Sequence, residues 1–331
     1  MRRKEHIITF KGFTKKFKNN VVGPIDLAIE QGKFVALLGS SGSGKTVILD
    51  SMMGLIKKYK GTITFAGYNR KRAKSYKANA SLGVYQQVDF SLETLTCYDY
   101  LKMRCNYTGL KKENQKEVLE FWMKYFDLWE SRKKRIQNFS LGMKNRVNLI
   151  LCFLNNPDIY ILDEPGANLD SMWRNKINNL FRELKSLNKT LIVSSHNINE
   201  IIDLIDNYIV VYNGSKIFEG SKEELNIYTK YKIFLSEKFD VKEFREFLDE
   251  KGIRTFKYDE EEISIIFATK NLLQINWSFL YFIKKGIPII NVTKLSVNME
   301  SIHKALEDQI SFLGDETGEV NPRRKRVKIN K

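Results

Sequence analysis

The chain carries one short loop pattern that restricts it to a small set of folds. Residues 39–46 read GSSGSGKT and fit the pattern G-x-x-x-x-G-K-[ST], with an apolar run at 34–38 before them and a helix-forming stretch at 46–55 after them. A strand, a glycine-rich loop and a helix in this order direct several backbone N–H groups and the positive end of the helix at one anion. The alternative is a flexible Gly/Ser loop beside a surface lysine. The pattern predicts an α/β fold with a phosphate-binding loop.

The predicted loop suits a nucleoside triphosphate with its magnesium ion. The Lys45 ammonium group would reach the β- and γ-phosphates, and the Thr46 hydroxyl would ligate Mg²⁺. An Asn-Lys-x-Asp element that selects guanine is missing, because Asn188-Lys189-Thr190-Leu191 lacks the acid. We therefore expect ATP and Mg²⁺ as cofactors, with the ATP-binding residues Gly39, Ser40, Ser41, Gly42, Ser43, Gly44, Lys45 and Thr46.

A second pattern supplies two carboxylates. The apolar run 159–162 predicts a buried strand that ends at Asp163 and Glu164. An aspartate in this position holds Mg²⁺ in phosphate-loop enzymes, and a glutamate one residue further on can polarise the attacking water as a general base. The alternative is an acidic first turn of a helix, which the helix dipole favours. The preceding strand favours the metal and general-base interpretation.

The order of the remaining motifs resembles the nucleotide-binding subunit of an ABC transporter, over about residues 5–222. The stretch Phe139-Ser140-Leu141-Gly142-Met143 stands where that family has its signature Leu-Ser-Gly-Gly-Gln. It keeps the two positions with a phosphate role, Ser140 and Gly142, and departs from the family spelling at Phe139, Leu141 and Met143. Lys144 and Arg146 match the residues that usually follow. The Ser-Leu-Gly-Met spelling resembles a branch of bacterial drug and antimicrobial-peptide exporters.

Four further residues match family motifs. Gln87 resembles the glutamine of the Q-loop, and is preferred to Gln86 because Leu95-Thr96 then falls where the family often has Leu-Thr. Asp170 resembles the D-loop aspartate, and His196 the H-loop histidine. Phe17 resembles the aromatic residue that stacks on adenine, although it could equally belong to the core.

The resemblance implies a mechanism shared between two subunits. Two nucleotide-binding domains would close head to tail on two ATP molecules, with Lys45, Gln87, Asp163 and His196 acting in cis and Ser140 and Gly142 in trans. Glu164, His196 and Gln87 would be the catalytic residues, and Thr46, Gln87 and Asp163 would hold the metal. The partners implied are an integral membrane permease and a second copy of this chain or a homologous subunit.

The chain is expected to contain two domains and a tail. Residues 1–225 read as the α/β nucleotide-binding domain of the ABC type, with a helical subdomain at about 90–156. Residues 226–310 read as a smaller α+β domain with the ferredoxin-like order βαββαβ, followed by a helix at 298–307. Residues 311–331 read as a flexible basic tail.

Composition bounds the partners and the location. The formal net charge of +16 suggests an anionic partner, for which anionic lipid is one candidate, although a solvated basic surface is the alternative. Base-reading motifs are absent around the basic clusters, so nucleic acid is not expected. A signal peptide and a membrane-spanning run are not found, and three cysteines fit free thiols. Together with these observations, the resemblance to ABC transporter subunits implies a peripheral protein on the cytoplasmic face of the membrane, held there by a permease.

Two other functions remain open. A non-transport ABC ATPase that acts on nucleic acid or ribosomes would agree with the basic charge, but such proteins usually have two nucleotide-binding domains or a long coiled-coil insert. A regulatory binding module without turnover would not need Asp163, Glu164 and His196 together. The sequence therefore favours the ATPase subunit of an exporter.

Overall fold

The computed structural model describes residues 6–166, 169–195, 201–222, 224–225, 229–253, 256–269 and 272–295. The chain divides into two compact units, residues 1–222 and 223–331. His196, Asn168, the expected helix 298–307 and the tail 311–331 lie outside the described residues. In the part of the chain that is described, no helix has the length and apolarity needed to cross a bilayer.

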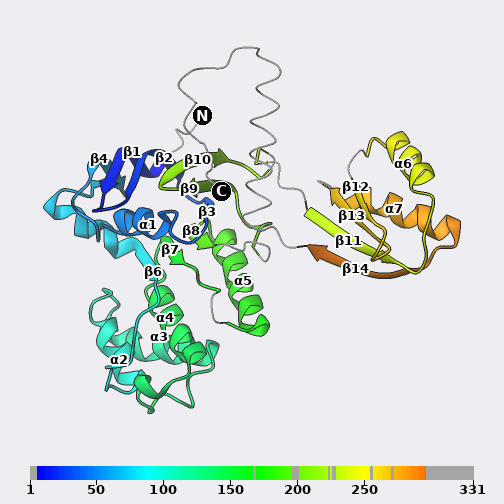
Figure 1. Ribbon diagram of the computed structural model, residues 1–331. Helices are drawn as coiled ribbons and strands as arrows, with labels where there is room; N and C mark the ends of the chain where they lie inside the picture. The colour runs from blue at the N-terminus through cyan, green and yellow to red at the C-terminus, as the bar shows by residue number, and fades with distance from the viewer. Residues whose placement is uncertain are drawn as a thin grey trace. The chain divides into compact units, whose positions relative to one another are not determined.

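Unit 1 is built on a six-stranded sheet with the order β10-β9-β3-β8-β7-β6 (Figure 1). All neighbouring pairs are parallel except β9 with β10. The central strand β3 is buried along its whole length, as expected for a strand covered on both faces. The strands are β3 (Phe34–Leu38), β6 (Leu82–Tyr85), β7 (Ile159–Asp163), β8 (Thr190–Ser195), β9 (Asn207–Tyr212) and β10 (Ser215–Gly220).

The hairpin between β9 and β10 turns at Asn213-Gly214. Asn213 and Gly214 both adopt positive φ angles, 46° and 77°, which a type I′ turn requires at both central residues. The turn places an antiparallel edge strand on an otherwise parallel sheet.

A second, antiparallel sheet has the order β2-β1-β4-β5. Helix α1 (Lys45–Met53) contributes Ile48, Leu49 and Met52 to a core that also contains side chains of both sheets. The strands are β1 (His6–Lys16), β2 (Val21–Glu30), β4 (Lys60–Phe65) and β5 (Tyr68–Asn69). The helix that follows the phosphate-binding loop is thus fixed between two sheets.

The end of α1 is held by a buried arginine. Arg70 is 1% exposed, and its Nε donates a hydrogen bond to the Met52 carbonyl oxygen at 2.6 Å. A cation beside the last carbonyl groups of a helix interacts favourably with the helix dipole. Burial lowers the pKa of Arg70 to about 10, which leaves the guanidinium charged at neutral pH. The 3₁₀ helix η1 (Ala73–Ser81) follows and accepts a further bond from Arg70 through the Ser75 carbonyl.

Helices gather beyond the carboxyl end of β6 (Figure 1). They are α2 (Cys97–Cys105), α3 (Lys112–Tyr125), the 3₁₀ turn η2 (Ile136–Asn138) and α4 (Leu141–Phe153). Arg146 of α4 joins this region to α5 (Ser171–Ser186): its Nη1 donates to the Phe126 carbonyl at 2.9 Å, and its guanidinium lies 4.4 Å from the Trp173 ring. Cys97, Cys105 and Cys152 are buried free thiols, as predicted.

Unit 2 is an α+β domain with the predicted βαββαβ order. Its antiparallel sheet has the order β12-β13-β11-β14, and its core joins side chains from the strands and both helices. The first helix is capped at Asp240, whose side chain accepts hydrogen bonds from the backbone N–H groups of Lys242 and Glu243. The elements are β11 (Thr229–Leu235), α6 (Val241–Glu250), β12 (Phe256–Asp259), β13 (Ser264–Thr269), α7 (Leu272–Lys285) and β14 (Ile289–Leu295).

Candidate nucleotide-binding site

The loop between β3 and α1 has the shape that a phosphate cradle requires. A Cβ atom on Gly39 would lie 2.3 Å from Ser43 Oγ and 2.6 Å from the Val211 carbonyl oxygen, so only glycine fits there. Gly44 has φ of 108° and immediately precedes the first helical residue. The tip of the loop, Ser40-Ser41-Gly42, is exposed, while the hydroxyl of Ser43 is buried. The exposed tip lies at the positive end of α1, as predicted.

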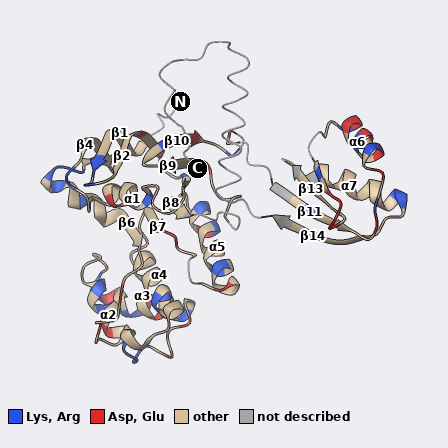
Figure 2. Cartoon of the chain, viewed as in Figure 1, with Lys and Arg blue, Asp and Glu red and all other residues tan. Residues whose placement is uncertain are grey.

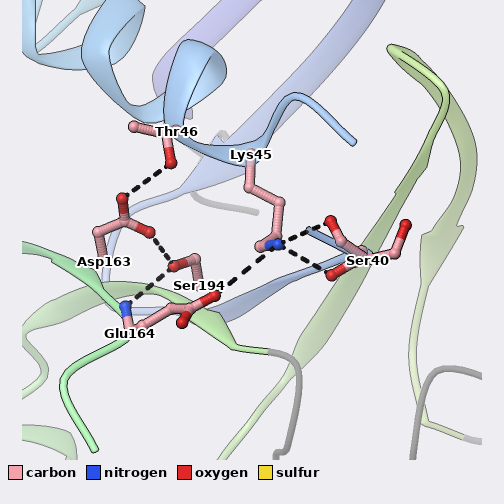
Figure 3. A network of polar contacts seen from close by, with 7 residues as sticks. Ser40, Lys45, Thr46, Asp163, Glu164 and Ser194 are labelled. Atoms are coloured by element: carbon pink, nitrogen blue, oxygen red, sulfur yellow. Dashed lines mark hydrogen bonds and ion pairs between the residues drawn. The ribbon is translucent and has the colours of Figure 1, made fainter. Parts of the chain in front are cut away.

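Lys45 is buried at the base of this loop (Figure 3). It is 6% exposed, and its Nζ donates hydrogen bonds to the carbonyl oxygens of Gly39 at 2.9 Å and Ser40 at 3.1 Å. Glu164 Oε1 lies 3.9 Å from the same ammonium group. The Lys45 ammonium group thus contacts both the loop carbonyl groups and the Glu164 carboxylate.

Asp163 and Thr46 face each other across the end of the sheet (Figure 3). The Thr46 hydroxyl donates a hydrogen bond to Asp163 Oδ2 at 3.0 Å. Ser194 on the neighbouring strand donates to Asp163 Oδ1, and its hydroxyl also accepts a bond from the Glu164 N–H at 3.1 Å. The predicted metal ligands Thr46 and Asp163 therefore lie together, and Ser194 joins them although its motif position alone did not suggest it.

Glu164 has an unusual backbone conformation. Its φ is 51°, the left-handed region that residues other than glycine seldom adopt. Its N–H also donates to the Ser194 carbonyl oxygen at 3.2 Å, so two bonds to one residue hold this turn. Left-handed residues outside glycine concentrate at functional sites, where the surrounding structure fixes them.

The two neighbouring glutamines after β6 have different environments. Gln86 is half-buried, and its Nε2 donates to Asp50 Oδ1 of α1 at 3.0 Å. Gln87 is exposed. Burial, with the negative charge of Asp163, raises the pKa of Asp50, and the Gln86 hydrogen bond opposes this shift. Gln86 is thus committed to α1, whereas the side chain of Gln87 remains accessible.

Ser140 caps the signature helix α4. Its φ and ψ are those of an N-cap, −60° and 161°, and its hydroxyl accepts a bond from the Met143 N–H at 3.2 Å. Leu141 is 57% exposed at the start of the helix, and Gly142 and Met143 are half-buried. Within the ranges that the structure describes, the Ser140 side chain has no bond to Lys45, Thr46 or Asp163. The signature therefore presents a free helix N-terminus apart from the network around Lys45.

Two other predicted residues have clear positions. Phe17 follows β1 and is 45% exposed, with the Lys15 ammonium group 5.2 Å from its ring centre. It is therefore not a core residue. Asp170 is the N-cap of α5, because its Oδ1 accepts a bond from the Trp173 N–H at 3.0 Å.

Together, the parallel sheet, the loop before α1 and the paired carboxylates define a P-loop ATPase domain. The ABC transporter family model matches residues 22–167 of the chain. An uncharacterised ABC transporter ATP-binding protein of Bacillus subtilis is 33% identical over 223 residues, which are 66% of this chain and 71% of that protein. The chain belongs to the family of ABC transporter ATP-binding proteins. It is the ATP-binding subunit of such a transporter, and it hydrolyses ATP in a transport-coupled reaction.

Other relatives extend this comparison. The bacitracin transport ATP-binding protein of Bacillus licheniformis is 28% identical over 301 residues, which are 89% of this chain and 95% of that protein. Because unit 1 ends at residue 222, an alignment of that length includes part of unit 2. Among solved structures, the ATP-binding subunit of an ABC transporter has a TM-score of 0.61 at 22% identity, covering 66% of this chain and 91% of that one. At that identity the likeness supports the fold.

Proposed function

We propose that this subunit powers export of a drug, an antimicrobial peptide or a similar compound through a separate membrane permease. The observation that carries the proposal is the hydrogen-bonded set Lys45, Thr46, Asp163, Glu164 and Ser194 at one end of the sheet. Two relatives support export: the bacitracin transport protein, and the linearmycin resistance ATP-binding protein of Bacillus subtilis, 32% identical over 63% of this chain and 67% of that protein.

The donors at this site suit Mg²⁺. Thr46 Oγ1 and Asp163 Oδ2 are 3.0 Å apart, and neighbouring ligands of an octahedral Mg²⁺ ion, each at about 2.1 Å from it, are also separated by about 3 Å. We infer that these two oxygens, joined by Gln87, hold the ion. When bound, Mg²⁺ neutralises charge on the phosphate oxygens. Ser194 keeps Asp163 oriented through its hydroxyl.

The remaining site residues act on the phosphates and the water. Lys45 binds the β- and γ-phosphate oxygens by leaving the carbonyl groups of Gly39 and Ser40. Glu164 accepts the proton of the attacking water as general base. His196 and Gln87 complete the catalytic set, and Phe17, which is exposed, stacks on the adenine ring.

Each site is completed by a second subunit. Ser140 and Gly142 contact the γ-phosphate bound to the partner copy, because the N-terminus of α4, where Ser140 and Leu141 are exposed, carries positive dipole charge. Leu141 and Met143 flank that contact, and Asp170 lies at the same dimer interface. The partner is a second copy of this chain or a homologous subunit.

The permease docks on a cavity of unit 1. The cavity has a volume of about 310 Å³ and lies among η1, β6, α2 and α4. Asn148 of α4 lines it and is 2% exposed. Among the residues that the structure describes, neither the nitrogen nor the oxygen of its side-chain amide has a hydrogen-bond partner. Such a group favours an occupant that offers a donor and an acceptor. A docked permease would hold the subunit on the cytoplasmic face of the membrane.

Anionic lipid is a further partner of the docked subunit. Residues 51–81 contain eight Lys and Arg and neither Asp nor Glu; Figure 2 colours the basic residues blue and the acidic residues red. All of these cations except Arg70 are exposed. Tyr76, within η1 beside the cavity, is 67% exposed. Basic side chains near an anionic bilayer gain about 1 kcal/mol each.

The test is transport in reconstituted vesicles. The full chain and the permease that co-purifies with it should move a labelled antimicrobial peptide outward with ATP, and E164Q should bind ATP but transport nothing. Co-purification with ribosomes or RNA instead of a membrane protein would favour the non-transport function and contradict export.

A further inference from the structure

Asp50 is a polar residue that the nucleotide chemistry described above does not use. It lies on α1 one helical turn after Thr46, so both side chains occupy the same face of the helix. Thr46 contacts Asp163 at the end of β7, and Asp50 contacts Gln86 just after β6. Helix α1 is therefore tied to the ends of two strands by two side-chain bonds one turn apart.

The carboxylate of Asp50 has few partners. Within the described residues, Gln86 is the only side chain hydrogen-bonded to it, and no Lys or Arg nitrogen lies within ion-pair distance. A half-buried carboxylate without a cation loses hydration that one amide replaces only in part. An apolar side chain would fill this position without that cost, so the directional bond to Gln86 is the feature that distinguishes aspartate here.

Gln86 stands between two sites. Its side chain lines the cavity that contains Asn148, and its backbone leads directly to Gln87. Because Gln86 is anchored to α1, the next residue leaves the sheet at a fixed place relative to Thr46 and Asp163. A change at the cavity that moved Gln86 would move Gln87 as well.

We propose that Asp50 is a positioning residue for the ATPase reaction: its bond to Gln86 sets the place of Gln87 relative to the metal ligands Thr46 and Asp163. This inference rests on the proposed role of Gln87 at the metal. It assigns the two adjacent glutamines separate tasks, with Gln86 as the anchor and Gln87 as the residue that reaches the nucleotide.

An exchange of partners tests the bond. D50N keeps an oxygen acceptor for Gln86 and should retain kcat within about twofold, whereas D50A should lower kcat about tenfold with little change in KM for ATP. In Q86E two carboxylates lie opposite each other, so kcat at pH 8 should fall about as much as in D50A. The double variant D50N/Q86E restores the bond with donor and acceptor exchanged and should recover most of the lost kcat.

The apparent Mg²⁺ concentration for half-maximal rate supplies the second readout. It should rise in D50A and Q86E and return towards the wild-type value in D50N/Q86E, which a general loss of stability would not produce. N114A, at an exposed position of α3, is the matched control and should leave both quantities unchanged.

The outcomes separate this inference from the function it rests on. If D50A keeps its kcat within about twofold of wild type, or if D50N/Q86E is no faster than Q86E, Asp50 does not position the loop. The wild-type chain would still hydrolyse ATP in either case. If Q87A itself retained wild-type rate and Mg²⁺ dependence, the role of Gln87 would be wrong and the inference would fall with it.

Discussion

Asp163 and Ser194 are register partners on the parallel strands β7 and β8, and the Ser194 hydroxyl donates a hydrogen bond to Asp163 Oδ1. The same hydroxyl accepts a bond from the N–H of Glu164 at 3.1 Å. One serine thus fixes both Asp163, the proposed metal ligand, and the turn that carries Glu164, the proposed general base.

S194A should therefore weaken both the binding of Mg²⁺ at Asp163 and the positioning of Glu164. We expect kcat to fall about tenfold, equivalent to about 1.4 kcal/mol, and the Mg²⁺ requirement to rise. The measurement is steady-state ATPase activity over a Mg²⁺ titration. S194T retains the hydroxyl and should keep most of the activity. Equal losses in S194A and S194T would mean that packing, and not the hydrogen bond, is what matters.

Ser140 gives a prediction for the dimer. S140R should leave ATP binding by the monomer unchanged but remove ATP-driven association, because a bulky cation would occupy the free N-terminus of α4. Light scattering with ATP measures this in the E164Q background, in which we expect ATP hydrolysis to be blocked. N114R adds the same charge at an exposed position of α3 and should dimerise normally. Unchanged dimers in S140R would exclude the role in trans.

Asn148 gives a prediction in which stability and function change in opposite directions. N148L removes a buried amide that has no hydrogen-bond partner in the described part of the chain, so the isolated chain should gain about 1–3 kcal/mol in free energy of unfolding. The adjoining cavity provides room for the larger side chain. Denaturant unfolding measures the gain, and co-purification measures the expected loss of permease. A destabilised N148L would show that the amide has a partner in solution.

The pH dependence of stability can be predicted for Asp50. Burial and the charge of Asp163 raise the pKa of this carboxyl, so folding disfavours its ionised form. The wild-type protein should then lose stability relative to D50N as the pH rises through that raised pKa, with little difference below the ordinary pKa of aspartate. Urea unfolding of both proteins at several pH values between about 4 and 8 checks this. A difference that shrinks with rising pH would reverse the sign of the shift.

Contiguous motifs were predictable because their chemistry is local. The loop 39–46, the acids Asp163 and Glu164, and the Asn213-Gly214 turn each follow from neighbouring residues and backbone geometry. The βαββαβ order of unit 2 could be predicted for the same reason, since its strands and helices alternate with clear turn residues.

Other parts of the site depend on strand order, which the sequence does not display. Ser194 reaches Asp163 only because β8 lies beside β7, although the two residues are 31 positions apart. The bond between Asp50 and Gln86 likewise joins residues 36 positions apart. Arg146 on α4 contacts Trp173 on α5. A motif match compares Arg146 only with its neighbours in sequence, so it could not predict a contact with a different helix.

Helix α4 is capped by Ser140 and carries Asn148 eight residues after the cap, a rise of about 12 Å along one continuous helix. In the head-to-tail pair that we propose, the N-terminus of this helix would face the neighbour's nucleotide, while its middle would face the permease docked on its own subunit. The coupling between nucleotide and permease would then cross from one subunit to the other. ATP bound to one subunit would then act on the permease half that is docked on the other subunit. ATP at a single site would therefore already change the conformation of that permease half.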